Sequence, residues 1–422
     1  MEATRIRLAE GVHLTYLPAR KFKTSLLSAQ FVTPLRRETA GANALLAAVL
    51  RRGTVSCPDM GALSAKMDNL YDASIDYTVR KKGENQCVGF VASFIDDRYA
   101  PDGERLLEPA AALLGELICD PVTYHGRFVP EYFESEKTNL LEAIRSLIND
   151  KRDWADSRLL RALCDGEAYA VPRLGDEETV DKLQALKVYT QYRDLISTAP
   201  LEIIYSGSAD LERVKQALAA AFATLPREEV RVISTAAPHV CRESVQYVED
   251  VLDVTQGKLG MGFSCGSDDM PALLMGNTLF GGSSNSKLFL NVREKLSLCY
   301  YASSLYHRQK GLITVSSGIE FQNYQRAYDE IMAQLEAVQK GELEDWELEG
   351  ARSTLLNSYA TVGDSQGKLE NFYLGQAATG QHETPADLAR AIQDMTAERI
   401  CRAMSTVKLD TVYFLKGKEA EA

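Results

Sequence analysis

Two short patterns recur in this chain at a spacing of about 210 residues, which is half of its length. Thr138–Leu141 (TNLL) returns as Ser353–Leu356 (STLL), and Ile203–Gly207 (IIYSG) returns as Tyr413–Gly417 (YFLKG). A repeat of this period constrains the fold strongly, because both halves must bury their apolar faces in the same way. The spacing therefore predicts two homologous halves of equal size.

Each half is predicted to be an α+β domain, an antiparallel-rich sheet with helices packed on it. In the first half, short apolar or alternating runs predict strands at 13–17, 26–32 and 201–205 and a β-hairpin formed by 74–80 and 86–94. Helical periodicity predicts helices there at 40–50 (N-cap Thr39), 58–71 (N-cap Ser56), 104–119, 129–148, 153–164, 177–186, 188–197 and 211–225. In the second half, strands are predicted at 258–264, 308–317 and 411–415 and helices at 271–280, 321–339, 342–361, 365–378, 385–394 and 396–405.

Residues 226–245 contain Pro226, Pro238 and several charges, and they lack a sustained apolar period. They are predicted to be a linker between an N-terminal domain, residues 1–225, and a C-terminal domain, residues 246–422.

Composition excludes several classes of function. Asp and Glu number 59 against 47 Lys and Arg, a net charge of −12, which argues against nucleic acid as a partner. No apolar run is long enough to span a membrane, and the N-terminus lacks the apolar core of a signal peptide. The eight cysteines are scattered without a CxxC pair, which indicates reduced thiols. These features together predict a cytoplasmic protein.

The five histidines are isolated from one another in the sequence, which makes a metal site improbable. His13 and His307 lie in or beside predicted strands and are interpreted as structural or surface residues. There is no Gly-x-Ser-x-Gly motif, and no cysteine lies in the context of a nucleophile.

The helix that begins near residue 40 is rich in alanine and ends at Gly53. Small side chains at helical spacing are typical of a helix that packs closely against a sheet. A later predicted helix carries Glu136 and, six residues on, Glu142.

The second informative segment runs from Phe280 to Tyr300 (FGGSSNSKLFLNVREKLSLCY). It is not a phosphate-binding loop, because Lys287 does not follow a glycine. One interpretation is a glycine turn, with Ser284 or Asn285 capping the helix that follows. Arg293 could be a surface ion-pair residue and Tyr300 a core residue, or both could bind a ligand.

In the order and spacing of these segments, the chain resembles the pitrilysin/insulinase-type (M16) metallopeptidases with subunits of about 420 residues. Ser64–Ile75 and Tyr169–Glu178 resemble further family segments, so that the resemblance covers nearly the whole chain. In the family, the alanine-rich helix carries His-x-x-Glu-His before Gly-Thr, and a later helix supplies a glutamate as third zinc ligand.

The resemblance implies that the metal site of this chain has been lost. Counting back from Gly53-Thr54, the two metal histidines fall on Ala44 and Ala48, and the general base falls on Ala47. The third ligand falls on Ala143, while Glu142 is rotated about 100° around the helix from that position. Alanines cannot ligate a metal or move a proton, so no cofactor is expected in this chain.

The Phe280–Tyr300 segment resembles the family signature Gly-Gly, Ser-Arg-Leu-Phe, Arg-Glu-Lys, Gly-Leu-Ala-Tyr, with Lys287, Ser297 and Cys299 as departures. The resemblance implies that Arg293 and Tyr300 contact the substrate backbone and that Gly281 and Gly282 are also substrate-binding residues. A guanidinium and a phenol are donors suited to a peptide carbonyl or an oxyanion.

The family implies a clamshell of two such chains around a chamber that receives peptides. The chain is therefore expected to be a non-catalytic, substrate-binding subunit, and a zinc-bearing homologue of similar length would be its partner in a heterodimer. A homodimer is the other arrangement that the resemblance leaves open. The alternative function is an inactive peptide-binding or structural scaffold protein without proteolysis.

Overall fold

The computed structural model describes residues 3–233 and 238–418, which form two compact units. Of the described residues, unit 1 comprises 3–145, 171–233 and 363–382, and unit 2 comprises 146–170, 238–362 and 383–418. Of the predicted linker, residues 226–233 and 238–245 carry no helix or strand, and residues 234–237 lie outside the described residues. No helix in the described ranges has both the length and the apolar character that crossing a membrane requires.

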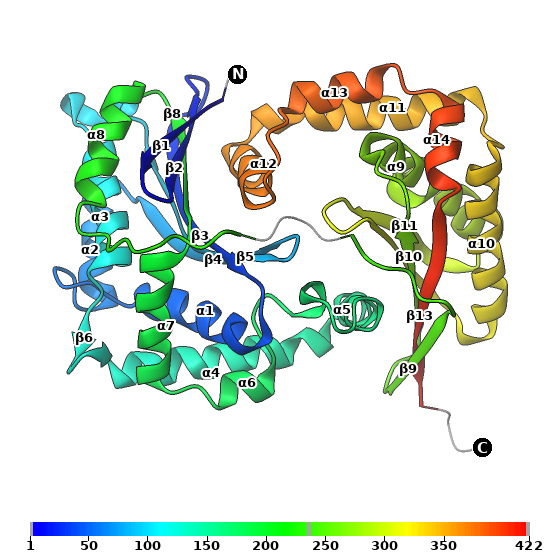
Figure 1. Ribbon diagram of the computed structural model, residues 1–422, viewed down its shortest axis with the longest axis horizontal. Coiled ribbons are helices and arrows are strands. Elements are labelled where there is room, and N and C mark those ends of the chain that lie inside the picture. The colour runs from blue at the N-terminus through cyan, green and yellow to red at the C-terminus, as the bar shows by residue number, and fades with distance from the viewer. Residues whose placement is uncertain (1–2, 234–237, 419–422) are drawn as a thin grey trace. The chain divides into compact units, whose positions relative to one another are not determined.

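Unit 1 is built on a six-stranded sheet with the order β1-β2-β8-β3-β5-β4 (Figure 1). All neighbours in it are antiparallel except β2 and β8. Its strands are β1 (Thr4–Ala9), β2 (Val12–Pro18), β3 (Thr24–Pro34), β4 (Ser74–Lys82), β5 (Asn85–Ile95) and β8 (Leu201–Gly207). Its helices are α1 (Arg37–Leu50), α2 (Met60–Asp68), α3 (Leu107–Cys119), α4 (Pro130–Ser146), α6 (Glu177–Asp181), α7 (Ala185–Thr198), α8 (Leu211–Ala221) and α12 (Gln366–Ala378), with a small β6–β7 hairpin (Thr123–Tyr124, Arg127–Phe128).

The central strand β3 is buried on both faces, and its buried residues include Ser28 and Gln30 as well as apolar side chains. Leu27, Ala29 and Phe31 face the apolar core that α1, α3 and α7 complete. The other face is polar, and α12 covers it: Ser28 Oγ donates to Glu370 of this helix over 2.7 Å. The layers of unit 1 are therefore an apolar helix layer, the sheet, and one helix on a polar face.

Unit 2 contains a five-stranded sheet with the order β11-β12-β10-β13-β9, in which only β13 and β9 are parallel. Its strands are β9 (Gln246–Leu252), β10 (Gly257–Cys265), β11 (Cys299–His307), β12 (Leu312–Ile319) and β13 (Val407–Gly417). Its helices are α5 (Lys151–Leu163), α9 (Met270–Asn277), α10 (Tyr324–Lys340), α11 (Asp345–Ala360), α13 (Pro385–Gln393) and α14 (Ala397–Met404). Without β1, the sheet of unit 1 has the same order and the same single parallel pair, so the α+β repeat expected from the sequence is present.

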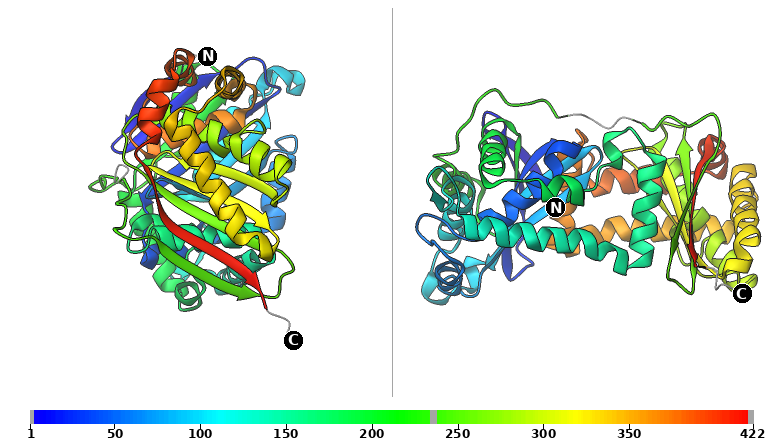
Figure 2. Two further views of the ribbon diagram at one scale, coloured as in Figure 1. Left: turned by 90° about the vertical axis from the view of Figure 1, so that its right-hand side faces the viewer. Right: turned by 90° about the horizontal axis from the view of Figure 1, so that it is seen from below.

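Each half of the sequence contributes one helix to the unit that is formed mainly by the other half. Helix α5 comes from the first half of the sequence but packs on β10 and β13 of unit 2, while α12 comes from the second half and packs on β3 and β8 of unit 1 (Figures 1 and 2). The approach of α5 to its sheet depends on two glycines. A Cβ at Gly260 would lie 3.2 Å from Leu159 Cδ2, and one at Gly262 would lie 2.7 Å from Leu163 Cδ2.

The predicted helix starts need small corrections. The helix predicted from Pro58 begins at Met60, because the Asp59 carboxylate rather than Ser56 caps it by accepting from the Ala62 N–H. Helix α1 begins at Arg37, before the predicted cap Thr39. Neither Ser284 nor Asn285 caps the helical turn after the glycines, which begins after Lys287.

Candidate functional site

Helix α1 is buried from Ala40 to Leu50, as its small side chains indicate. Ala44, Ala47 and Ala48 are exposed by only 2%, 0% and 6%. Side chains at i and i+4 lie on one face of a helix, and Ala44 and Ala48 share the face that borders a cavity. Ala47 lies beneath this face in the apolar core.

The cavity has a volume of about 720 Å³ and lies between α1, α4 and the edge strand β4. Ala143 of α4 lines it as well, so three of the four positions at which the zinc pattern would fall share one cavity. Glu142, one residue earlier, is exposed and does not line it, as the helical rotation predicts.

The remaining acid of the pattern, Glu136, lines the cavity but is already engaged. Its Oε1 accepts from Arg52 over 2.8 Å, and its Oε2 accepts from Asn139 over 3.1 Å. The Arg52 guanidinium also lies 5.0 Å from the centre of the Tyr132 ring, which fixes its direction. Arg52 thus neutralises the carboxylate of Glu136.

The cavity does not fit a zinc ion. Zinc sites in enzymes use three protein ligands drawn from His, Cys and carboxylates. Among the described residues that line the cavity, Glu136 is the single such residue, and four lysine or arginine side chains accompany it. No metal-dependent step is therefore derived for this chain.

The predicted substrate-binding segment lies in unit 2. Its two glycines fall in the helical turn Thr278–Gly282 that follows α9. Gly281 is buried against β11, since a Cβ there would lie 2.7 Å from the backbone nitrogen of Ser304. A Cβ at Gly282 would lie 2.9 Å from Asn277 Nδ2. Close packing alone thus accounts for both glycines, and their contact with a substrate stays a prediction.

Lys287, where the family has arginine, anchors this segment to α11. Its buried ammonium lies 3.0 Å from each carboxylate oxygen of Glu347. Glu347 Oε2 also accepts from the Glu344 N–H at the start of α11. The lysine is therefore a structural residue of the segment.

Arg293 and Tyr300 are both exposed in part, and each has a carboxylate beside it. Arg293 Nε lies 3.4 Å from Glu294 Oε1, so the residue does form a surface ion pair. Arg293 lies in the π-helical turn Leu288–Lys295, with 41% of its side chain exposed and its guanidinium 4.7 Å from the centre of the Phe289 ring. Tyr300 is 59% exposed on the edge strand β11, and its hydroxyl donates to Glu320 Oε1 over 2.5 Å. This hydrogen bond raises the pKa of the Tyr300 phenol. The core interpretation of Tyr300 is therefore wrong, and its binding role stays a prediction.

The turn that connects the two residues contains Ser297 with φ 49°, a left-handed conformation. The Ser297 N–H donates to the Arg293 carbonyl over 3.1 Å and closes the turn. Glycine, which the family has at this position, adopts such a conformation without steric cost. Ser297 therefore holds the Arg–Tyr turn at some expense in backbone strain.

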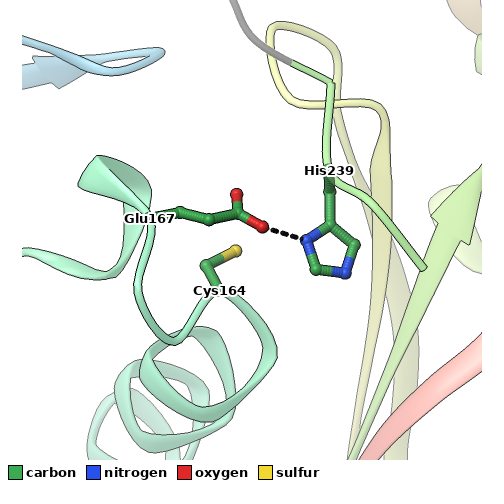
Figure 3. A group of neighbouring side chains, drawn as sticks. All are labelled: Cys164, Glu167 and His239. Atoms are coloured by element: carbon green, nitrogen blue, oxygen red, sulfur yellow. Dashed lines mark hydrogen bonds and ion pairs between the residues drawn. The ribbon is translucent and has the colours of Figure 1, made fainter. Parts of the chain in front are cut away.

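A buried cluster of charged groups around His239 in unit 2 was not predicted from the sequence. In the described residues, Cys164, Glu167 and His239 form one group of metal-ligand type (Figure 3). Glu167 Oε1 lies 2.5 Å from His239 Nδ1, and the buried Lys310 ammonium pairs with the same carboxylate. Lysine fills the place of a cation, so we interpret the cluster as a structural tie that holds residue 239 near the end of α5.

The other histidines named above are structural as well. His307 bonds to Tyr169 over 3.0 Å and to Thr314 over 2.9 Å. His13 lies 3.4 Å from the buried carboxylate of Glu202.

Comparisons with known proteins identify relatives over the whole chain. The family model described as "Peptidase M16 inactive domain" matches residues 182–355. The chain is 34% identical over 416 residues to a "Probable inactive metalloprotease YmfF" of Bacillus subtilis, which covers 97% of this chain and 96% of the relative. It is 22% identical to an "Uncharacterized zinc protease YmxG" of the same organism, over 74% of this chain and 76% of the relative. A solved peptidase M16 inactive domain from Pseudomonas fluorescens has the same fold, with a TM-score of 0.80, 17% identity and 100% of both chains covered.

Proposed function

The chain belongs to the M16 peptidase family, as an inactive metalloprotease homologue, and we propose that it is the substrate-binding subunit of a zinc-dependent peptidase of that type. A partner chain with an intact His-x-x-Glu-His motif supplies the zinc and the general base. The two chains together enclose the chamber in which a peptide is cleaved. All eight cysteines are free thiols, which suits a complex in the reducing cytoplasm.

One observation carries this proposal. The residues of the metal site are alanines around a cavity that does not fit zinc, whereas the two donors of the substrate-binding signature are both present and exposed. If the chain had lost every role in proteolysis, neither the metal-site residues nor the substrate-binding donors would be required. Retention of one set favours a division of roles between two chains.

The chemistry of Arg293 and Tyr300 suits this role. A guanidinium offers five N–H donors and a phenol offers one O–H, and both can hold a peptide carbonyl or stabilise an oxyanion. In the free chain the Tyr300 hydroxyl donates to Glu320. A substrate carbonyl would replace this carboxylate as the acceptor.

A partner of the required kind has precedents among the relatives. YmxG is named as a zinc protease and matches over about three quarters of both chains. A homologue of this type would have the length that a two-chain chamber needs. The partner that the experiment requires is a homologue of similar length with an intact His-x-x-Glu-His motif from the same organism.

The test is to purify the chain alone, the zinc-motif homologue alone, and the two together, and to measure zinc content and peptide cleavage in each. We expect zinc and activity only where the homologue is present, and the highest activity in the mixture. Zinc bound in stoichiometric amount to this chain alone, together with activity, would refute the proposal.

Substitutions then separate binding from assembly. Arg293→Ala and Tyr300→Phe should each lower cleavage by the mixture by about tenfold or more, because each removes a donor to the transition state. The controls Arg390→Ala and Tyr124→Phe change side chains that are comparably exposed, 71% and 51%, outside the segment. Equal activity of test and control variants would remove the binding role.

The alternative function is an inactive peptide-binding or scaffold protein with no associated proteolysis. The naming of the relative YmfF as probably inactive is compatible with this alternative. It predicts that the chain forms a homodimer and that the mixture cleaves peptides no faster than the zinc-motif homologue alone.

A further inference from the structure

A second cavity of unit 1 lies apart from the one beside Ala44 and Ala48. It has a volume of about 550 Å³, and its lining comes from β1, β2, β8, α8 and the residues that follow α8. Among the described residues, the two cavities share no lining side chain. Small-molecule sites in proteins have volumes of about 300–1,000 Å³, so this cavity has the size of a ligand site.

Most of the wall of this second cavity is apolar. Val12 and Ile203 from the sheet and Leu218 of α8 are buried core residues that line it. Leu8 and Phe222 line it as well and pack against the same core, but they are only half buried. Half-buried apolar side chains gain free energy when a further apolar group removes them from water. The wall therefore suits a hydrocarbon group.

Three cationic side chains and one carboxylate also line the cavity, and two of the cations are already neutralised. Arg7 pairs with Glu10, and Lys215 pairs with Glu212 over 2.8 Å. Both of these pairs lie at the surface, where ion pairs contribute little to stability. The third cation, Arg227, remains as the charge that a ligand would meet.

Arg227 follows α8 and has neutral acceptors. Its guanidinium donates over 3.0–3.2 Å to the backbone carbonyls of Glu10, Gly11, Ile196 and Ala199. A guanidinium has five N–H donors, so at least one is left for a ligand. No carboxylate in the described ranges bonds to Arg227, and burial lowers its pKa because desolvation penalises the charged form. An anion beside it would offset this penalty.

We propose that this cavity binds a medium-chain fatty acid, with the hydrocarbon chain against Leu8, Val12 and Phe222 and the carboxylate on Arg227. A largely apolar wall with one cation that no carboxylate neutralises fits a ligand with one negative charge at the end of an apolar chain. An extended peptide would press its backbone polar groups against apolar side chains, which costs desolvation free energy. An inorganic anion would leave the apolar wall uncovered.

This site goes beyond the proposed peptidase role and is independent of it. None of its lining residues belongs to the Phe280–Tyr300 segment, which lies in unit 2. A fatty acid can therefore bind to the chain whether or not a zinc-bearing partner exists, and the two proposals fail separately.

The test is isothermal titration calorimetry of the full chain, without a partner and after removal of co-purified lipid. Three ligands are titrated below their micelle concentrations. Decanoate has the expected chain and charge, decyltrimethylammonium has the same chain with the opposite charge, and butanoate has the same carboxylate on a much shorter chain. We expect one decanoate to bind per chain, decyltrimethylammonium to bind about tenfold more weakly or worse, and butanoate about a hundredfold more weakly or worse.

A filling variant locates the chain of the ligand. Ala219 is an exposed alanine of α8 that lines the cavity, and Ala219→Trp should lower the affinity for decanoate about tenfold by occupying part of the space. Ala220→Trp is the matched control, because Ala220 is the next exposed alanine of α8 but lines a different cavity. It should leave the affinity unchanged.

A charge variant locates the carboxylate. Arg227→Gln should lower the affinity for decanoate about tenfold, because it removes a charge-assisted hydrogen bond. Arg105→Gln is its control, since Arg105 is an exposed arginine of unit 1 outside the cavity. Circular dichroism melting checks that each variant is folded, and the ligand series and Ala219→Trp decide the outcome if Arg227→Gln does not fold.

Three results would each overturn the proposal. The first is the absence of saturable decanoate binding to the chain. The second is equal affinity for decanoate and decyltrimethylammonium. The third is decanoate binding that Ala219→Trp weakens no more than Ala220→Trp does.

Discussion

The docking of α5 on the sheet of unit 2 depends on Gly262, and Gly262→Ala is expected to destabilise the protein. A Cβ at this position would lie 2.7 Å from Leu163 Cδ2, and Leu163 is fully buried. Carbon atoms in contact prefer separations of about 3.5–4.0 Å. The helix or the leucine would therefore have to move by about 1 Å.

The magnitude follows from two opposing contributions. Overpacking of a core costs about 1–3 kcal/mol, whereas replacing glycine by alanine lowers the entropy of the unfolded chain and stabilises by about 0.4–1 kcal/mol. The net loss should be about 1–2 kcal/mol. Gly266→Ala serves as a control, because its Cβ would lie 3.4 Å from Thr406 Cβ, which is close to ordinary contact, so that only the gain of about 0.4–1 kcal/mol through the unfolded chain is expected.

The assay is urea unfolding followed by circular dichroism, combined with limited proteolysis around residues 146–170. Leu163→Ala alone should cost about 2–5 kcal/mol because it leaves a cavity. In that background Gly262→Ala should cost nothing, which gives a coupling energy of about 1–2 kcal/mol. Strictly additive effects of the two substitutions would refute the idea that glycine is needed for the approach of α5.

Three further predictions concern other parts of the molecule. Ser297→Gly should raise the free energy of unfolding by about 0.5 kcal/mol in urea titrations, since glycine removes the strain of the left-handed backbone, and a loss of stability would contradict this. Lys287→Met should lower it by about 3 kcal/mol because it leaves Glu347 buried without its cation, and the double variant with Glu347→Leu should recover most of that loss. Burial alone would raise the pKa of Glu116, but hydrogen bonds from Ser56, Lys66 and Thr54 lower this pKa from 4.5 to about 2. The stability that the ionised Glu116 contributes is therefore present above pH 4.5 and is lost as the pH falls toward 2. Glu116→Gln should therefore reduce the decrease in melting temperature between pH 5 and pH 2.5, and an unchanged slope would show that other groups dominate.

Much of the fold could be predicted because local signals agree with the tertiary structure. The echo between Ile203–Gly207 and Tyr413–Gly417 marks β8 and β13, which occupy equivalent places in the two sheets. The hairpin around Lys82–Asn85 forms β4 and β5 as its turn chemistry indicates. The exchange of α5 and α12 could not be predicted, because an amphipathic pattern says which face of a helix is buried but not which sheet buries it.

The candidate site was predictable only in part. The positions Ala44, Ala48 and Ala143 could be placed together through the helical spacing of a known motif, and they do border one cavity. The charge of that cavity could not be predicted, because Arg173 comes from a loop far from β4 in the sequence. The structural role of Gly281 depends on the close approach of β11, which no local pattern records.

The exchange of helices has a consequence for folding during synthesis. Unit 1 has its last strand at Gly207 but receives α12 only from Gln366 onward, about 160 residues later, which is roughly 8–30 s of translation. During this interval one face of its sheet stays uncovered. That face carries polar groups such as Ser28 and Arg80, which later bind Glu370, and it therefore offers nascent chains little apolar surface on which to aggregate.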